Sequence, residues 1–174
     1  MPNLKDLPIG EMAPEQVNAV IEIPKGTHVK IEYDVNMQIF KVDRVLYSAV
    51  HYPTAYGFIP STLWDDGDPL DILVLTEEPL QTGLFVQTRP IGVLVMTDEK
   101  GSDSKILSVP LNDPRYTGVE DIEHVQKHFL LEAEHFFETY KELEGKHVTS
   151  FGWKPRIDAK SAIKKGIVSY KLAH

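Results

Sequence analysis

Three aspartates lie within six residues in the segment 66–72, which reads Asp-Gly-Asp-Pro-Leu-Asp-Ile. Carboxylates this close repel one another, so their grouping is favoured where a cation neutralises them. Asp66 and Asp68 share strand parity and Asp71 does not, so the three converge only if the intervening glycine and proline turn the chain. An acidic surface turn is the alternative interpretation, whereas an EF-hand loop is excluded because its sixth position requires a glycine. The segment therefore predicts a site for a hard divalent cation.

A second acidic pair, Asp98 and Asp103, flanks a predicted hairpin tip, and Lys105 shares a strand face with Asp103. By itself this is the composition of an ordinary surface turn. Sites for Mg²⁺ use oxygen ligands only, with few carboxylates per ion and the remaining positions filled by water and substrate phosphate. The two clusters together predict a site for two or more Mg²⁺ ions, as displacement at phosphorus between two metals requires.

Cationic and phenolic side chains accompany the same elements. Each lysine alone is more often a solvated strand residue, and a tyrosine on an apolar helix stripe is more often a core residue. As a group beside carboxylates, they form a candidate wall for a phosphate anion. They are Lys30, Arg44, Lys105, Lys141, Tyr52, Tyr56 and Tyr140.

The seven histidines show metal-ligand spacing only at His124 and His128. The zincin pattern needs a glutamate directly after the first histidine, and Val125 stands there, so the histidines are interpreted as surface residues. The Gly-x-Ser-x-Gly, P-loop and dinucleotide glycine patterns are absent from the sequence.

Composition limits the class of protein. The 174 residues are 42% hydrophobic and 25% charged, include no cysteine, and carry a formal net charge of −8. Disulfide scaffolds, zinc ribbons and thiol nucleophiles are therefore excluded, and so acidic a chain is a poor ligand for a nucleic acid. No apolar run is long enough to cross a bilayer, and the first residues lack a secretory pattern. We expect one cytoplasmic domain over residues 1–174, with no nucleic-acid or membrane partner.

Short strands precede helices along the chain. Apolar and β-branched runs predict strands over 17–23, 28–34, 38–47, 72–75, 84–89, 91–97 and 105–109, with clean alternation over 28–34. Pro90 separates two of these strands, and Phe40, Val42, Arg44 and Leu46 share one face. A helical stripe follows over 125–143, with Gly145 after its end, and a second helix is predicted from Asp158 as N-cap. The order predicts an α+β protein with a closed or Greek-key β-barrel and two C-terminal helices.

These residues resemble the soluble family I inorganic pyrophosphatases, in their compact prokaryotic form. The segment 66–72 looks like the family signature, and similarity continues through 20–24, 52–57, 96–105, 135–141 and 152–153. The resemblance implies an OB-like five-stranded closed β-barrel with additional strands, and a homohexamer. It further implies Mg²⁺-dependent hydrolysis of pyrophosphate to two orthophosphates, with several ions per site and Mn²⁺, Zn²⁺ or Co²⁺ as substitutes.

The resemblance also implies individual roles. Asp68 corresponds to the general base on a water that bridges two metal ions, and Tyr56 to a residue that tunes this water or contacts phosphate. The implied metal ligands are Asp66, Asp71, Asp98, Asp103, Glu22 and Glu32. The implied substrate-binding residues are Lys30, Arg44, Tyr56, Lys105, Tyr140 and Lys141.

Two alternative functions stay open from the sequence alone. A metal-dependent phosphohydrolase could act on organic phosphates through the same carboxylates. A non-catalytic OB-type module could bind an oligosaccharide or single-stranded nucleic acid, although the net charge of −8 disfavours the latter.

Overall fold

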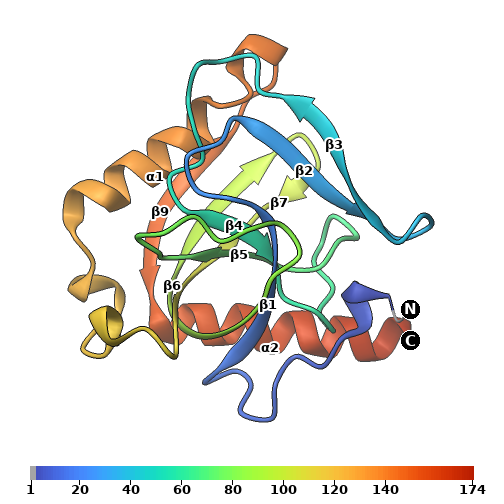
Figure 1. Cartoon of the computed structure of the whole chain (residues 1–174), viewed down its shortest axis with the longest axis vertical. Helices are drawn as coiled ribbons and strands as arrows, with labels where there is room; N and C mark the ends of the chain where they lie inside the picture. Colours follow the sequence, from blue (N-terminus) through green and yellow to red (C-terminus); the bar gives the residue numbers. More distant parts are fainter. Residues whose placement is uncertain (1–2) are drawn as a thin grey trace.

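Five strands close into a barrel in the computed structural model, which describes residues 3–174. In order around the ring they are β1 (Val17–Ile23), β4 (Ala55–Phe58), β5 (Asp71–Val74), β8 (Lys105–Pro110) and β6 (Phe85–Asp98). The ring closes because β1 pairs with both β4 and β6; every pairing is antiparallel except that of β5 with β8. The predicted five-stranded closed barrel is confirmed (Figure 1).

Additional strands surround the barrel. β2 (Val29–Asp34) and β3 (Ile39–Val45) form a separate hairpin that projects to one side (Figure 1). β7 (Gly101–Ser102) and β9 (Thr149–Pro155) both pair with β6. Neither β4 nor β9 was predicted, because β4 lies in an aromatic stretch without clean alternation and β9 contains Gly152 in a left-handed conformation (φ 82°).

The predicted break at Pro90 was wrong, because β6 runs unbroken through it. The pairing of β6 with β8 shifts register between Pro90 and Gly92, so the missing amide hydrogen of the proline falls at an irregularity of the ladder. One long strand therefore spans the barrel and carries Asp98 at its end.

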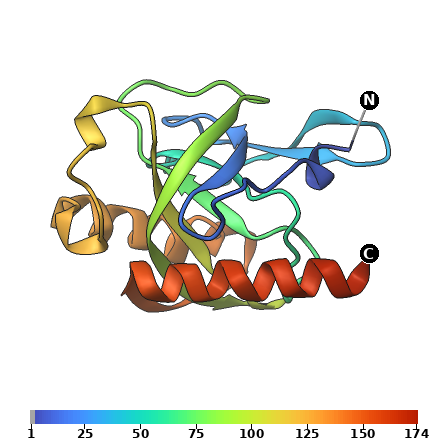
Figure 2. The ribbon, with the colours of Figure 1, turned by 90° about the horizontal axis from the view of Figure 1, so that it is seen from below.

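The two predicted C-terminal helices are α1 (Lys127–Thr139) and α2 (Arg156–Ala173), with 3₁₀ turns at η1 (Leu4–Asp6), η2 (Pro114–Tyr116), η3 (Ile122–His124) and η4 (Glu142–Glu144). α1 packs against β9, and α2 runs beneath the barrel against β6 and β9 (Figures 1 and 2). Within residues 3–174, no helix has both the length and the apolar character needed to cross a membrane.

The helix ends differ from the sequence prediction. α1 stops at Thr139, and Gly145 (φ 73°) instead ends the following turn η4. α2 begins at Arg156 and not after Asp158, because Asp121 Oδ1 accepts a hydrogen bond from the Arg156 amide at 3.1 Å. A carboxylate distant in sequence thus supplies the cap that Asp158 was expected to supply.

A bulge in the β2–β3 hairpin changes the face on which Arg44 lies. Lys30 pairs with Arg44 but Ile31 pairs with Val42, so Asp43 is the extra residue. The predicted common face of Arg44 with Phe40 and Val42 was therefore wrong. The bulge places Arg44 beside Lys30 and leaves Val42 largely exposed.

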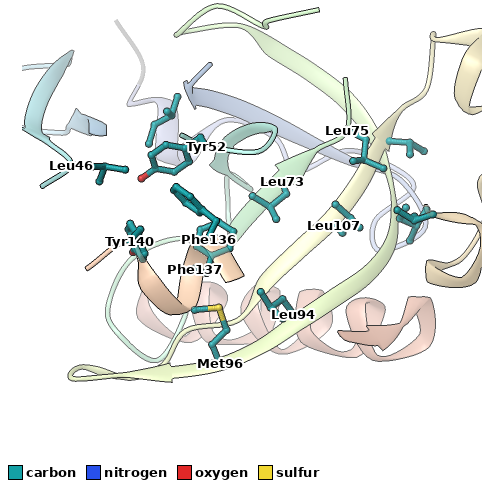
Figure 3. Packing of buried hydrophobic residues seen from close by; sticks show 14 residues of the cluster. Leu46, Tyr52, Leu73, Leu75, Leu94, Met96, Leu107, Phe136, Phe137 and Tyr140 are labelled. Carbon is teal, nitrogen blue, oxygen red and sulfur yellow. The ribbon is translucent and has the colours of Figure 1, made fainter. Parts of the chain in front are cut away.

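Side chains of successive β5 residues belong alternately to two apolar clusters on opposite sides of the sheet. Ile72 and Val74 belong to a cluster that α2 covers with Ile163, whereas Leu73 belongs to a second cluster with Leu107. Figure 3 shows this second cluster; its aromatic members are Tyr52, Phe136, Phe137 and Tyr140. Asp71, two residues before Leu73, lies at the end of the same face, which places the candidate site above this cluster.

Candidate active site

Parallel pairing of β5 with β8 builds the centre of the site. The pairing aligns Asp71 with Lys105, the first residues of the two strands. Lys105 Nζ lies 2.8 Å from Asp71 Oδ2 and 2.8 Å from Asp103 Oδ1, and only 1% of Lys105 is exposed. The ammonium also stands 5.0 Å from the centre of the Phe137 ring and 5.3 Å from that of Tyr56. A buried ammonium is thus held between the buried carboxylate of Asp103 and the partly exposed carboxylate of Asp71, above the aromatic cluster.

The aspartate-rich segment forms the turn that its glycine and proline predicted. Gly67 has φ 89°, and the Asp68 amide donates to Asp66 Oδ1 at 3.1 Å. The Trp64 amide donates to the Asp68 carbonyl at 2.8 Å, which closes the loop. The turn brings Asp66 and Asp68 to the same cavity as Asp71, so the predicted convergence of the three aspartates is confirmed.

The β6–β7 hairpin supplies the opposite wall. Asp98 pairs with Gly101 across this hairpin, as predicted for a tip in this segment. Asp98 Oδ2 accepts from Lys141 Nζ at 3.0 Å, and both side chains are at most one-tenth exposed. Lys141 directly follows α1 and its capping residue Tyr140, so the end of α1 is joined to the barrel at the site.

One cavity of about 230 Å³ contains nearly all of the predicted site residues. Those that line it are Glu22, Lys30, Glu32, Tyr56, Asp66, Asp68, Asp71, Asp98, Asp103, Lys105, Tyr140 and Lys141. Ammonium groups of the cavity pair with its carboxylates: Lys105 with Asp71 and Asp103, Lys141 with Asp98, and Lys30 with Glu32. The arrangement suits a small, highly charged anion together with cations.

Arg44 is the predicted site residue that does not line the cavity. Its Nε lies 2.8 Å from Glu144 Oε1, and its Nη1 pairs with Asp43. Glu144 belongs to η4, so this ion pair ties the β2–β3 hairpin to the segment after α1. Tyr52, the other phenol noted in the sequence, is 2% exposed and belongs to the aromatic cluster below the cavity.

Sequence reasoning missed two lysines of the cavity, Lys5 and Lys100. Lys5 Nζ donates to Asp68 Oδ1 at 2.9 Å, although the two residues are 63 positions apart. The Ser61 amide donates to the Lys5 carbonyl at 2.8 Å, which holds the N-terminal turn against the barrel. No periodicity or motif near the N-terminus signals this contact, because it arises only from tertiary packing.

Burial and mutual repulsion shift the titration of the acidic groups. Desolvation, with the neighbouring charges of Asp71 and Glu32, raises the pKa of Glu22 to about 8. Desolvation also raises the pKa values of Asp71 and Asp66 above their ordinary values. Asp103 behaves oppositely, because the charge of Lys105 outweighs desolvation and lowers its pKa. The site therefore holds negative charge at an electrostatic cost.

The donor set fits hard divalent cations. Its ligands are carboxylate oxygens, which Mg²⁺ prefers. A bound cation would lower the raised pKa values of these carboxyl groups and so favour their ionised form. Among residues 3–174, no three acidic or histidine side chains converge on one point as metal ligands. The Lys105 ammonium instead stands between Asp71 and Asp103 and neutralises them.

The raised pKa of Glu22 predicts a stability that falls as pH rises when divalent ions are chelated. Folding raises this pKa from 4.5 to about 8, so the folded state binds more protons than the unfolded state between those values. The free energy of unfolding in EDTA should therefore decrease from pH 5 to pH 8, by up to about 1.4 kcal/mol per pH unit for one such group. Urea unfolding at several pH values measures this slope. The Glu22→Gln variant should show little dependence of stability on pH, and added Mg²⁺ should make the dependence of the wild type smaller. A free energy of unfolding that rises between pH 5 and pH 8 would contradict the raised pKa of Glu22.

The barrel and its charged cavity define a class of protein that binds small anions together with cations. A protein-family model described as inorganic pyrophosphatase matches residues 19–171. The chain belongs to the inorganic pyrophosphatase family, and membership implies dependence on a divalent metal.

Relatives from bacteria and archaea support this membership. The inorganic pyrophosphatase of Thermus thermophilus is 49% identical to this chain over an aligned span of 174 residues, gaps included. The alignment covers 98% of this chain and 99% of the relative. That of Methanosarcina acetivorans is 52% identical over 145 residues, 83% of this chain and 86% of the relative. A crystal structure of the Thermus thermophilus enzyme superposes with a TM-score of 0.95 at 48% identity and covers 98% of this chain and 99% of that one.

Proposed function

We propose that this chain hydrolyses inorganic pyrophosphate to two orthophosphates, with Mg²⁺ as the physiological cation. The observation that carries the proposal is a cavity lined both by carboxylates and by ammonium groups. Carboxylates alone would repel pyrophosphate and lysines alone would not bind Mg²⁺, so the mixture suits the two together.

Six carboxylates are proposed as the groups that hold the ions: Glu22, Glu32, Asp66, Asp71, Asp98 and Asp103. When bound, Mg²⁺ lowers the pKa of water and offsets the negative charge of the phosphoryl oxygens. The Lys105 ammonium already neutralises Asp71 and Asp103, so it lets these two carboxylates stay close together until the cation binds.

Lysines and tyrosines are proposed to bind and orient the substrate. Lys30, Lys105 and Lys141 present ammonium groups to the cavity, and charge-assisted hydrogen bonds from such groups to phosphate are short and strong. Tyr56 and Tyr140 add hydroxyl donors. Desolvation by burial raises the pKa of Tyr140 well above its ordinary value, so its proton stays on the oxygen. Arg44 would reach the anion only after release from Glu144 and Asp43.

Asp68 is proposed as the general base. Its side chain is 60% exposed at the mouth of the cavity, where it can contact an incoming water. The Asp71 side chain is only 23% exposed, and this difference fits the proposed division between a proton acceptor and a metal ligand. Lys5 Nζ donates to Asp68 Oδ1 at the same mouth, which leaves Oδ2 without this contact and able to accept a proton.

Comparison of substrates tests the proposal against the phosphohydrolase alternative. Phosphate release in Mg²⁺ should be fast from pyrophosphate and at least an order of magnitude slower from ATP and p-nitrophenyl phosphate. The cavity of about 230 Å³ is lined mainly by charged groups and lacks a broad apolar wall for an organic leaving group. Equal or greater activity on p-nitrophenyl phosphate would favour the alternative. A salt-dependent mobility shift of single-stranded DNA without phosphate release would favour the non-catalytic module.

Lys5 should affect substrate binding more than turnover. Replacement by glutamine removes one ammonium group from the cavity mouth, and loss of one partly exposed charged hydrogen bond corresponds to about 1 kcal/mol, or a KM about five-fold higher. Steady-state kinetics measure KM and kcat separately. Lys41→Gln is the matched control, because Lys41 pairs with Asp34 and does not line the cavity. An unchanged KM for Lys5→Gln would remove Lys5 from the binding set.

We also propose a homohexamer that functions in the cytoplasm. Apolar side chains on β3 support an interface, since Val42 and Val45 are 61% and 51% exposed. Sedimentation should give about six times the chain mass of 19.7 kDa. A monomeric species at micromolar concentration would contradict this assembly.

A further inference from the structure

Two histidines that are distant in sequence face each other outside the cavity. His28 Nδ1 lies 3.4 Å from His51 Nε2, and the ring centroids are 5.1 Å apart. Both residues are exposed, and neither lines the cavity. His28 immediately precedes β2, and His51 lies in the segment before β4.

The backbone that carries these rings is firmly held. Tyr52, directly after His51, exchanges two hydrogen bonds of 2.9 Å with the segment 26–27, directly before His28. The Leu46 amide donates to the His28 carbonyl at 2.8 Å. Tyr52 is itself 2% exposed and anchored in the aromatic cluster. The two rings are therefore presented together by a fixed backbone, which lowers the entropic cost of holding a shared ligand.

We propose that His28 and His51 form a surface site for a divalent transition-metal ion, Zn²⁺, with one nitrogen from each ring and water at the remaining positions. Two nitrogens about 2.0 to 2.1 Å from a tetrahedral Zn²⁺ stand about 3.3 Å apart. The observed separation of 3.4 Å matches this value before any ion binds.

Binding of Zn²⁺ to the two facing nitrogens requires one ring to change its tautomer. Without metal, one of the facing nitrogens is protonated and donates to the other. On binding, both facing nitrogens coordinate the ion, and the proton moves to the outer nitrogen of the donor ring through solvent. Among the residues that the structure describes, no third histidine or carboxylate completes a three-ligand group, so the site is open and exchangeable.

The two kinds of site differ in chemistry. Imidazole nitrogen suits Zn²⁺ and Cu²⁺, whereas carboxylate and water oxygens suit Mg²⁺. Excess Mg²⁺ should therefore occupy the acidic cavity and leave the histidine pair open to Zn²⁺. The pair His124 and His128 offers no equivalent site, because His124 Nδ1 accepts the amide hydrogens of Glu120 and Asp121.

Titration of the full chain with Zn²⁺ in excess Mg²⁺, followed by calorimetry, tests the site. We expect one Zn²⁺ per chain, with affinity at least about ten-fold weaker in His28→Gln and in His51→Gln, because each loses one of two nitrogen ligands. His135→Gln is the matched control, since His135 is an exposed histidine on α1 and should leave the affinity unchanged. Both test positions are exposed, so these substitutions should not impair folding.

Electron paramagnetic resonance of bound Cu²⁺ gives a second readout. The wild type should show coupling to two nitrogen nuclei, and either variant to fewer. Zn²⁺ affinity that is equal in wild type and both variants, or a Cu²⁺ spectrum without nitrogen coupling, would overturn the proposal. Either result would leave the proposed hydrolysis of pyrophosphate unaffected.

Discussion

Asp68→Asn is expected to lower the rate of pyrophosphate hydrolysis by about 100-fold or more. Asparagine keeps the shape of the side chain and an Oδ1 that can accept from Lys5, as Asp68 does at 2.9 Å. It cannot accept a proton from water, so only general-base catalysis is lost. Because Asp68 is 60% exposed at the cavity mouth, the fold should be retained. Steady-state phosphate release, with Mg²⁺ binding measured by calorimetry, separates loss of the base from loss of the metal.

Asp65→Asn provides the matched control for this substitution. Asp65 is exposed in the same turn, pairs with Lys165 at 2.7 Å, and does not line the cavity. Its removal should change turnover by less than about two-fold, since exposed ion pairs contribute little. Normal turnover in Asp68→Asn, or an equal loss in Asp65→Asn, would show that Asp68 is not the proton acceptor.

Lys105→Met should have the largest effect on stability. Methionine retains contact with the rings of Tyr56 and Phe137 but leaves Asp71 and Asp103 without the ammonium that neutralises them. Breaking a buried ion pair from one side costs about 3 to 5 kcal/mol. We expect this loss in the free energy of unfolding in EDTA, measured by urea denaturation, together with a large loss of activity. Mg²⁺ should restore part of the stability, because it replaces the missing positive charge.

Lys146→Met is the corresponding surface control. Lys146 lies 3.6 Å from Glu99 and is 44% exposed, so its removal should cost at most about 1 kcal/mol. A loss of less than about 1 kcal/mol in Lys105→Met would show that Lys105 does not offset the charge of the buried aspartates.

Local sequence patterns predicted a β-barrel followed by helices, and the aspartates and lysines at the centre of the cavity; the five-stranded closure and the roles of Glu22 and Glu32 came from the family resemblance. An apolar, β-branched run located β1, clean alternation located β2, and the glycine and proline of segment 66–72 predicted the convergence of its aspartates. These signals succeed because strand periodicity and turn chemistry are properties of neighbouring residues.

Features that depend on long-range pairing were not predictable in the same way. The bulge at Asp43, which moves Arg44 to the face of Lys30, is visible only in the register of β2 with β3. Lys5 reaches Asp68 because the N-terminal turn packs on the barrel.

The contact between His28 and His51 was also not predictable from the spacing of histidines in the sequence. Spacing in the sequence singled out His124 and His128, which lie on different helical segments, η3 and α1. The fold instead brings His28 to His51, 23 residues away. Neither local spacing nor composition carries that information.

The most direct test of the central claim is orthophosphate release from pyrophosphate by the purified wild-type chain, in Mg²⁺ and in excess EDTA. The crowded carboxylates of the cavity should make hydrolysis depend on the cation, so release should be rapid in Mg²⁺, absent in EDTA, and restored when Mg²⁺ is added back. Equal release in EDTA, or none in Mg²⁺ from the folded protein, would contradict the account.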